Sequence, residues 1–276
     1  MSYEKQHELG LAGLALLRNW LVGNNKDAKP ILEEIKGLIK KSSVEGEVTT
    51  LDVSKGYQAW AETYDSVPNL LIQVEEPVVR SVLKKFKPGD ALDAACGSGR
   101  YSEFLNFLGH KVTGVDLSPD MLSQARKNRS KQINFLQGDL TEIPLNDETV
   151  DLEICALALT HFPNIDKALS ELSRVVRSKG HIVISDIHPW LVALGGQAEF
   201  FDQLGKHNYV PNYIHWHSSY FESFNRLGLK VIQCLEPIME QKHVKLAKTG
   251  FSLKEKTVEV ALKDLPIAVV WVLEKP

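Results

Sequence analysis

The sequence predicts an α/β fold: a doubly wound, seven-stranded sheet, mostly parallel with an antiparallel edge strand, preceded by an N-terminal helical extension. From residue 90 onward, apolar segments of strand length alternate with segments of helical periodicity, which is typical of a parallel sheet covered by helices on both faces. The last two apolar segments are joined by about thirty residues with little helical pattern. That connection allows an antiparallel strand near the end of the chain.

The first ninety residues are expected to be helical. Residues 3–22 and 27–41 have apolar positions at helical spacing, and they are separated by a polar stretch. Residues 41–50 are polar and indicate a linker. The helical pattern returns over 53–86, where Pro77 would kink or restart the helix. The N-terminal extension is therefore assigned to residues 1–50 and the main domain to residues 51–276.

The main domain supplies the strands and their intervening helices. Strands are expected over residues 90–95, 111–118, 133–140, 150–158, 180–189, 230–237 and 266–275. Helices are expected over residues 100–107, 119–128, 164–177 and 218–229. The aromatic and glycine-containing segment 190–217 matches neither pattern.

Composition excludes several classes of function. The chain has 276 residues, 43% hydrophobic and 24% charged, with a net charge of −3. It contains no lysine–arginine block of the kind that follows a nucleic-acid backbone. The apolar run 11–17 is far shorter than a membrane span and lacks a basic leader. Three widely spaced cysteines form neither a disulfide framework nor a zinc knuckle. We expect a cytoplasmic protein that binds neither nucleic acid nor membrane.

A carboxylate and a glycine turn follow the first strand of the sheet. Ligands of doubly wound sheets bind beyond the carboxyl ends of the strands, where Gly97 and Gly99 would let the backbone approach a ligand closely. Asp93 would repel a pyrophosphate. Ser102 also replaces the third glycine of the dinucleotide fingerprint. The turn therefore favours a ligand that carries positive charge, unless it is only a bare turn.

Two further acids follow the next two strands. Asp116 can accept two hydrogen bonds from a ribose diol. Asp139 can accept from an exocyclic amine, although an acid there could instead cap a helix. Acids at three successive strand ends would line one cleft. A nucleoside with an ammonium and a sulfonium group, such as S-adenosylmethionine (SAM), fits those charges.

Four segments resemble, in order, the motifs of class I SAM-dependent methyltransferases. They are LDAACGSGRYS, GVDLSPDML, QGDLTEIPL and VDLEICALALTHF. The segment YQAWAETYDS resembles the helix that precedes the domain in many small-molecule members, of the methyltransferase-11 and methyltransferase-25 kind. The likeness covers about residues 55–190, and 218–276 by topology. It implies a Rossmann-like domain with residues 189–218 as a substrate-side insertion and residues 1–50 as an extension or lid.

The resemblance also implies a cofactor, SAM, which would leave as S-adenosylhomocysteine (SAH). Tyr57 and Arg100 would meet its carboxylate, Asp116 its ribose, and Asp139 with Leu140 its adenine. The full implied set of cofactor-binding residues is Tyr57, Tyr64, Asp93, Ala94, Gly97, Gly99, Arg100, Asp116, Leu117, Met121, Asp139, Leu140 and Ala156.

The implied reaction is methyl transfer from SAM to an oxygen or nitrogen, with carbon as a further alternative, of a small aromatic or apolar metabolite of secondary metabolism. His161 and His188 are the candidate catalytic residues, as general bases or hydrogen-bond partners of the acceptor. The candidate substrate-pocket residues are Trp190, His215, Trp216, His217 and Tyr220. Simple packing would also account for most of these histidines.

Other functions stay open on the sequence alone. His188, His215 and His217 form an alternative metal-ligand set, which we do not favour because no carboxylate or cysteine completes it locally. The chain could use SAM, or a histidine-bound metal, for a reaction other than methyl transfer. It could also be a non-catalytic SAM-binding subunit. The N-terminal helices are expected either to cover the cofactor cleft or to form the face of a homodimer.

Overall fold

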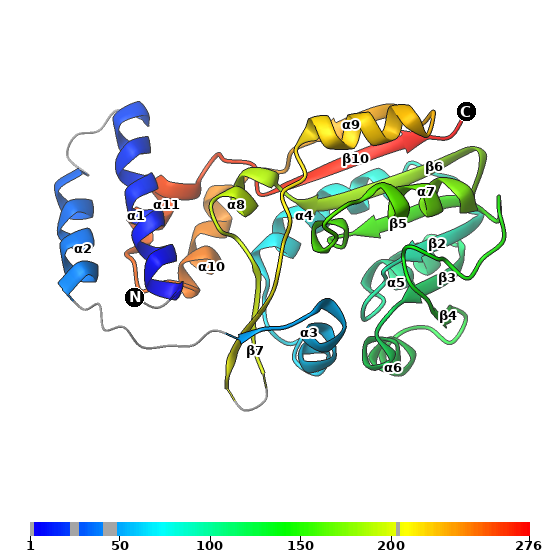
Figure 1. The fold of residues 1–276 in the computed structure, drawn as a ribbon, viewed down its shortest axis with the longest axis horizontal. Coiled ribbons are helices and arrows are strands. Elements are labelled where there is room, and N and C mark those ends of the chain that lie inside the picture. The colour runs from blue at the N-terminus through cyan, green and yellow to red at the C-terminus, as the bar shows by residue number, and fades with distance from the viewer. Residues whose placement is uncertain (1–2, 23–27, 41–48, 203–204) are drawn as a thin grey trace.

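The computed structural model describes residues 3–22, 28–40, 49–202 and 205–276 (Figure 1). Its centre is a seven-stranded sheet with strand order β4-β3-β2-β5-β6-β10-β9. The strands are β2 (Asp90–Ala94), β3 (Lys111–Asp116), β4 (Asn134–Gln137), β5 (Val150–Ala156), β6 (Val176–Ile187), β9 (Lys230–Leu235) and β10 (Ala268–Glu274). Only β10 is reversed, because it runs antiparallel to both β6 and the edge strand β9. The predicted doubly wound architecture is confirmed.

Helices cover both faces of this sheet. One face packs against α7 (Asp166–Val175) and α9 (His217–Arg226), with Leu172 and Phe224 fully buried. The other face packs against α4 (Leu70–Leu83), α5 (Arg100–Phe107) and α6 (Pro119–Asn128). Two of these helices, α4 and α6, begin at side-chain caps. Asn69 Oδ1 accepts from the Leu71 amide at 2.9 Å, and Ser118 Oγ accepts from the Met121 amide at 3.3 Å.

The segment that matched no pattern forms a small second sheet. It contains α8 (Pro189–Ala193), β7 (Ala198–Phe201) and β8 (His207–Val210). Strand β8 pairs with β7 on one side and with β1 (Thr49–Thr50) on the other. The rest of the expected linker, residues 41–48, lies outside the described residues. Four-residue strands in a separate sheet are too short to give a clear alternation in sequence.

Helices also occupy the connection in which the sequence showed little helical pattern. They are the 3₁₀ turn η2 (Gln241–His243), α10 (Val244–Thr249) and α11 (Glu255–Leu262). The predicted helix 164–177 is shorter than expected, because the chain enters β6 at Val176.

The N-terminal helices pack on that late helical segment. α1 (Tyr3–Val22) and α2 (Ala28–Lys40) lie at the end of the molecule where α10 and α11 also lie (Figure 1). Leu11 and Ala15 of α1 share an apolar cluster with Val258 of α11. Arg18 Nη1 donates to the Ala261 carbonyl at 2.9 Å. No helix of the described segments is both long enough and apolar enough to cross a bilayer.

One buried acid in β5 gives a test of the fold. Both carboxylate oxygens of Glu153 are buried, and neither has a hydrogen-bond partner among the residues that the structure describes. Burial raises the pKa of Glu153 well above its ordinary value of 4.5, and Glu171 adds to the effect. The folded protein therefore holds a proton that the unfolded chain releases above about pH 4.5, so this group's contribution to stability falls as pH rises.

Replacing Glu153 with glutamine removes that titration. We expect the free energy of unfolding of Glu153→Gln, relative to the native protein, to increase with pH above 4.5 by up to about 1.4 kcal/mol per pH unit. Urea unfolding at pH 5, 6, 7 and 8 measures this difference. Glu222→Gln, at an exposed position of α9, is the matched control and should give a flat difference. A flat difference for Glu153→Gln as well would mean that the buried carboxyl does not hold a proton.

Candidate functional site

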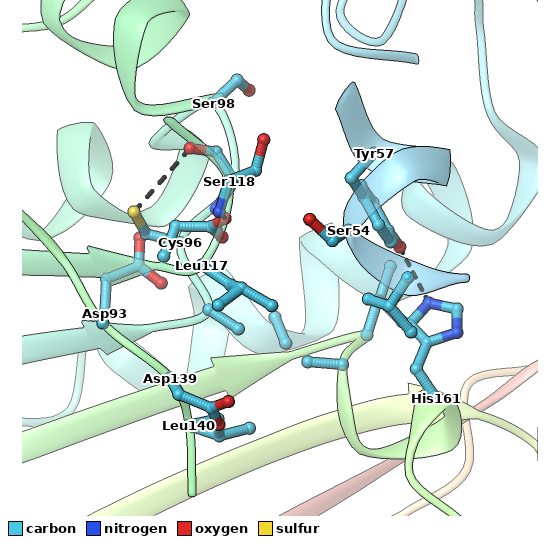
Figure 2. Close-up of a pocket in the computed structure, with 18 of the residues that line it drawn as sticks. Ser54, Tyr57, Asp93, Cys96, Ser98, Leu117, Ser118, Asp139, Leu140 and His161 are labelled. Atoms are coloured by element: carbon cyan, nitrogen blue, oxygen red, sulfur yellow. Dashed lines mark hydrogen bonds between the residues drawn. The ribbon is translucent and has the colours of Figure 1, made fainter. Parts of the chain in front are cut away.

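A cavity of about 180 Å³, the first cavity, opens at the carboxyl ends of β2, β3 and β5 (Figure 2). Helix α3 (Val53–Trp60) closes its other side with Ser54 and Tyr57. The predicted cofactor residues on its wall are Tyr57, Tyr64, Asp93, Gly97, Arg100, Asp116, Leu117, Asp139, Leu140 and Ala156. Ala94, Gly99 and Met121 are not among the described wall residues. Ala94 and Met121 are fully buried in the core, and Gly99 caps α5.

The glycine turn is held by the acid of the neighbouring strand. Gly97 and Gly99 have φ of 52° and 80°, values that favour glycine. Asp116 Oδ2 accepts from the Gly97 amide at 2.7 Å, and Oδ1 accepts from the Ser118 amide at 2.8 Å. Burial raises the pKa of Asp116. Each oxygen keeps further acceptor capacity, so the carboxylate can fix the turn and still bind a diol.

Asp93 lies at the base of the first cavity and is only 2% exposed. Its Oδ2 accepts from Ser102 Oγ at 2.7 Å, and burial raises the pKa of Asp93 to about 7. A cation in the cavity would favour the ionised carboxylate and lower this pKa. Binding of a cationic ligand near neutral pH would therefore release a proton.

Asp139 adopts a local turn at the mouth of the first cavity. Its Oδ1 accepts from the Thr141 amide at 2.7 Å and from Thr141 Oγ1 at 2.8 Å. This is the geometry of an Asx-turn. No helix begins in the described residues that follow, so Asp139 does not cap a helix. Gly138 and Leu140 beside it also line the wall, so the same segment forms both a turn and a cavity edge.

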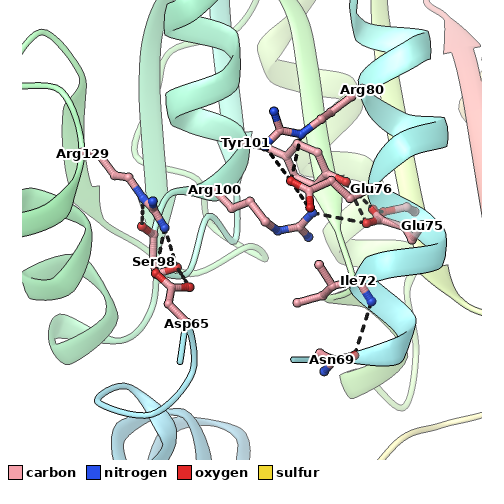
Figure 3. A network of polar contacts seen from close by, with 11 residues as sticks. Asp65, Asn69, Ile72, Glu75, Glu76, Arg80, Ser98, Arg100, Tyr101 and Arg129 are labelled. Atoms are coloured by element: carbon pink, nitrogen blue, oxygen red, sulfur yellow. Dashed lines mark hydrogen bonds and ion pairs between the residues drawn. The ribbon is translucent and has the colours of Figure 1, made fainter. Parts of the chain in front are cut away.

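Two ion networks join α4 and the loop after α3 to the glycine turn (Figure 3). Arg129 donates to the Ser98 carbonyl and to Asp65 Oδ2, both at 2.8 Å. Arg100 Nη1 lies 3.4 Å from Glu75 Oε2, and the Tyr101 hydroxyl lies 2.7 Å from both Glu75 oxygens. These contacts hold the Arg100 side chain beside the first cavity.

Glu75 was not among the site residues expected from the sequence. It is fully buried, it also bonds to Ser185 of β6, and burial raises its pKa. One sequence feature could have indicated a role for Glu75: it is an acid at an apolar position of a helix that the sequence predicted. Val74, Val79 and Val82 on the same helix are buried with it.

His161 is held as a neutral proton acceptor. Its Nδ1 lies 3.0 Å from the Pro211 carbonyl, which can only accept, so Nδ1 carries the proton. Its Nε2 lies 2.8 Å from the Tyr57 hydroxyl and therefore accepts from it (Figure 2). Burial lowers the pKa of His161 below 6.5, so the ring is neutral at pH 7. This is the protonation state that a general base needs.

A second cavity of about 290 Å³ adjoins the first. Tyr57, Tyr64, Leu157 and His161 line both, so the imidazole lies at their boundary. The other walls of the second cavity come from elements far apart in the chain, including α1, α4 and the segment after β6. Of the predicted substrate residues, Trp190 lines this cavity.

The other predicted substrate residues lie away from the described walls of both cavities. His215 Nε2 is 2.8 Å from the Phe162 carbonyl, and Tyr220 is buried against Trp271. Trp216 is 49% exposed. His217 contacts Glu236 instead. These residues lie between β8 and the first turns of α9.

The predicted metal-ligand set comes together in part. His188 and His217 place Nε2 3.0 and 3.1 Å from Glu236 Oε1, while His215 is elsewhere. Glu236 supplies the carboxylate that the sequence did not place near these histidines. His188 Nδ1 accepts from the Trp190 amide at 3.4 Å, so its Nε2 carries a proton and donates to Glu236. The proton occupies the atom a metal would need. His188 is also absent from the described walls of both cavities, which separates it from the chemistry expected at His161.

The fold agrees with comparisons to known proteins. Residues 92–184, from β2 into β6, match the model of a family described as methyltransferase domain. Residues 92–184 therefore form a methyltransferase domain. Malonyl-[acyl-carrier protein] O-methyltransferase of Yersinia pestis is 33% identical over 135 residues, 49% of this chain and 50% of that protein. The chain thus spans about half the length of the curated relatives it matches.

Solved structures agree on the fold of this methyltransferase domain. A SAM-dependent methyltransferase from Mesorhizobium loti superposes with a TM-score of 0.58 at 20% identity, covering 75% of this chain and all of that one. The DhpI–SAH complex superposes with a TM-score of 0.57 at 19% identity, covering 80% of this chain and 95% of that one. At these identities the likeness describes the fold alone.

Proposed function

We propose that this protein transfers a methyl group from SAM to an oxygen or nitrogen atom of a small molecule and releases SAH. The observation that carries the proposal is the meeting of the two cavities at His161. The first cavity has acids at three strand ends and a glycine turn, which suit a cationic nucleoside. The second has room for an acceptor on the other side of a neutral imidazole.

Different residues of the first cavity would bind different parts of the cofactor. Asp116, already fixed by two backbone amides, would accept from the ribose hydroxyls. Arg100 lines the wall and would face the carboxylate. Asp93 would favour the cationic end, and the segment of Asp139 and Leu140 would lie along the adenine. Tyr57 points to His161, so we assign it to the boundary between the cavities rather than to the carboxylate.

His161 would accept the proton that the acceptor loses. Bound SAM would supply a methyl group on an already activated sulfonium. The protein's task is then to align the acceptor, to exclude water and to take up one proton. An acceptor O–H or N–H would replace the Tyr57 hydroxyl as the donor to Nε2. The Pro211 carbonyl keeps the proton on Nδ1 and stabilises the imidazolium that forms.

The finer parts of the proposal rest on composition and relatives. The aromatic side chains of the second cavity support an aromatic or apolar acceptor, as expected in secondary metabolism. The net charge of −3 supports an acceptor other than nucleic acid. A cytoplasmic location and a homodimer belong to the same proposal. The relatives' name favours O-methylation of a malonyl group on a carrier protein as a second candidate.

Calorimetry and a turnover assay test the proposed function. We expect SAM and SAH to bind the purified chain at one site, and NADH not to bind. With a panel of small alcohols, phenols, amines and acyl thioesters, SAH should form together with a product heavier by one methyl group. SAH binding without methylated product would favour the non-catalytic subunit or a different SAM reaction. Failure to bind SAM or SAH would reject the proposal.

A further inference from the structure

The second cavity continues from its boundary with the first cavity into an apolar part of the molecule. Tyr57, Tyr64 and His161 lie at that boundary. We propose that the acceptor is an amphiphile, with an O–H or N–H head group at His161 and an unbranched aliphatic chain of roughly ten carbon atoms in the second cavity. The inference rests on the proposed function, because it names the class of acceptor which that function requires.

Leucine and isoleucine are the most frequent residues of the described wall. Nine of them line the second cavity, against five phenylalanine, tyrosine and tryptophan residues, so the wall is mainly aliphatic. Two of the five aromatic residues, Tyr57 and Tyr64, lie at the boundary with the first cavity. An aliphatic chain gains from burial against such a wall through the hydrophobic effect, without the ring faces and edges with which an aromatic ligand packs best.

Much of the aliphatic wall belongs to the apolar cluster that joins the N-terminal helices to α11. Leu11 of α1 and Leu262 of α11 are 6% and 4% exposed, and Leu70 of α4 packs against the same cluster. All three line the second cavity, and none is among the described residues of the first. The second cavity therefore leads from the methyl-transfer boundary toward the packed side of α1, where a chain would be removed from water.

Several polar side chains on the wall are already bonded within the protein. Asn69 Oδ1 caps α4, Gln197 Oε1 accepts from the Asn212 amide at 2.7 Å, and Asp186 accepts from two backbone amides. His161 Nε2 instead accepts from a side-chain hydroxyl, which an acceptor can replace. A sugar or nucleotide must exchange many hydrogen bonds with its site, whereas an aliphatic chain with one polar head group needs few partners.

The volume of the second cavity sets the length of the chain. An apolar cavity of about 150 Å³ holds one benzene molecule, which has six carbon atoms. The second cavity has a volume of about 290 Å³. By the same ratio it has room for roughly ten to twelve carbon atoms.

Helix α1 is a fixed wall of this cavity. Arg18 Nη1 donates to the Ala261 carbonyl at 2.9 Å, and Glu8 Oε1 accepts from the Ser252 amide. These two contacts lie on either side of Leu11 along the helix, so they hold its side chain against α11. The N-terminal extension thereby acquires a role, because α1 closes the part of the second cavity that would hold the end of the chain.

The chemical step balances for an O–H head group. The oxygen forms a bond to the methyl carbon while the carbon–sulfur bond of SAM breaks. The hydroxyl proton passes to His161 Nε2. The products are a methyl ether, SAH and a protonated His161, which returns its proton to solvent.

A series of linear alcohols tests the inference: 1-butanol, 1-hexanol, 1-octanol and 1-decanol. In calorimetry, with and without saturating SAH, we expect the dissociation constant to fall about fourfold for each added methylene, which corresponds to about 0.8 kcal/mol. The decrease should level off near roughly ten carbon atoms, when the chain fills the cavity. The aromatic alcohol 2-phenylethanol has the same number of carbon atoms as 1-octanol and should bind at least tenfold more weakly.

A substitution on α1 tests where the chain lies. Leu11→Phe fills the part of the cavity next to α1, so it should weaken binding of 1-decanol at least fivefold. Binding of 1-butanol should stay within twofold, because a short chain at His161 does not reach α1. Leu17→Phe is the matched control: it lies on the same helix, its side chain is 71% exposed, and the whole series should bind as in the native protein.

The outcomes separate this inference from the proposed function. A dissociation constant that does not depend on chain length, equal binding of 2-phenylethanol and 1-octanol, or native 1-decanol binding in folded Leu11→Phe would overturn the inference. Loss of alcohol binding in the presence of SAH would also overturn it, because the chain would then occupy the first cavity. The expected length series without any SAH binding would reject the proposed function and leave a chain-binding cavity. If Leu11→Phe does not fold, the length series and the comparison with 2-phenylethanol decide.

Discussion

Replacing His161 with glutamine is expected to lower kcat by about 10²- to 10⁴-fold, the range that a positioned general base contributes. Glutamine can keep hydrogen bonds to the Tyr57 hydroxyl and the Pro211 carbonyl, so the boundary between the cavities should keep its shape. It cannot take up the acceptor's proton. Calorimetry should show little change in SAH affinity, so the loss lies in turnover.

The pH profile separates a catalytic from a packing role for this residue. Because burial lowers the pKa of His161 below 6.5, activity should be complete near pH 7.5 and fall as pH drops through that lowered pKa. The acidic limb assigned to this group should disappear in His161→Gln. His215→Gln is the matched control, since His215 bonds to a backbone carbonyl away from the described walls of both cavities. Unchanged kcat in His161→Gln would remove His161 from the mechanism.

The cofactor side of the site was the part most accessible from sequence. Its residues follow consecutive strands, and the carboxyl ends of parallel strands share one edge of a sheet. Asp93, Asp116 and Asp139 could therefore be placed together before any coordinates were known, and all three line the first cavity. For these acids, the spacing along the chain predicts the position in space.

The substrate side could not be placed in the same way. The second cavity is lined by residues of α1, α3, β7 and α11. These elements come from nearly opposite ends of the chain. His7 meets Glu199 across the gap between the N-terminal helices and the small sheet. No periodicity within one segment encodes such a contact. Histidines near the strand ends were therefore grouped by type, whereas His161 lines both cavities and His215 and His217 are absent from their described walls.

Asp116→Asn is expected to weaken SAH binding by about 10- to 100-fold. Hydrogen bonds to a charged acceptor contribute about 1.5–3 kcal/mol, and about 1.4 kcal/mol corresponds to a tenfold change in affinity. The substitution removes the charge from the proposed ribose site. It also turns one NH₂ group toward either the Gly97 or the Ser118 amide, where a donor now faces a donor. The glycine turn should loosen together with the loss of the diol contact.

A matched substitution separates the contact from the overall charge. Asp120 lies four residues later on α6 and is exposed, so Asp120→Asn changes net charge equally without touching the turn. Its SAH affinity should stay within about twofold of the native value, because exposed charges are screened at ordinary salt. Equal losses in both variants would mean that a diffuse field, rather than the fixed Asp116 carboxylate, attracts the nucleoside. If a folded Asp116→Asn protein bound SAH with native affinity, Asp116 would not be part of the cofactor site. The main support for a cofactor in the first cavity would then be lost.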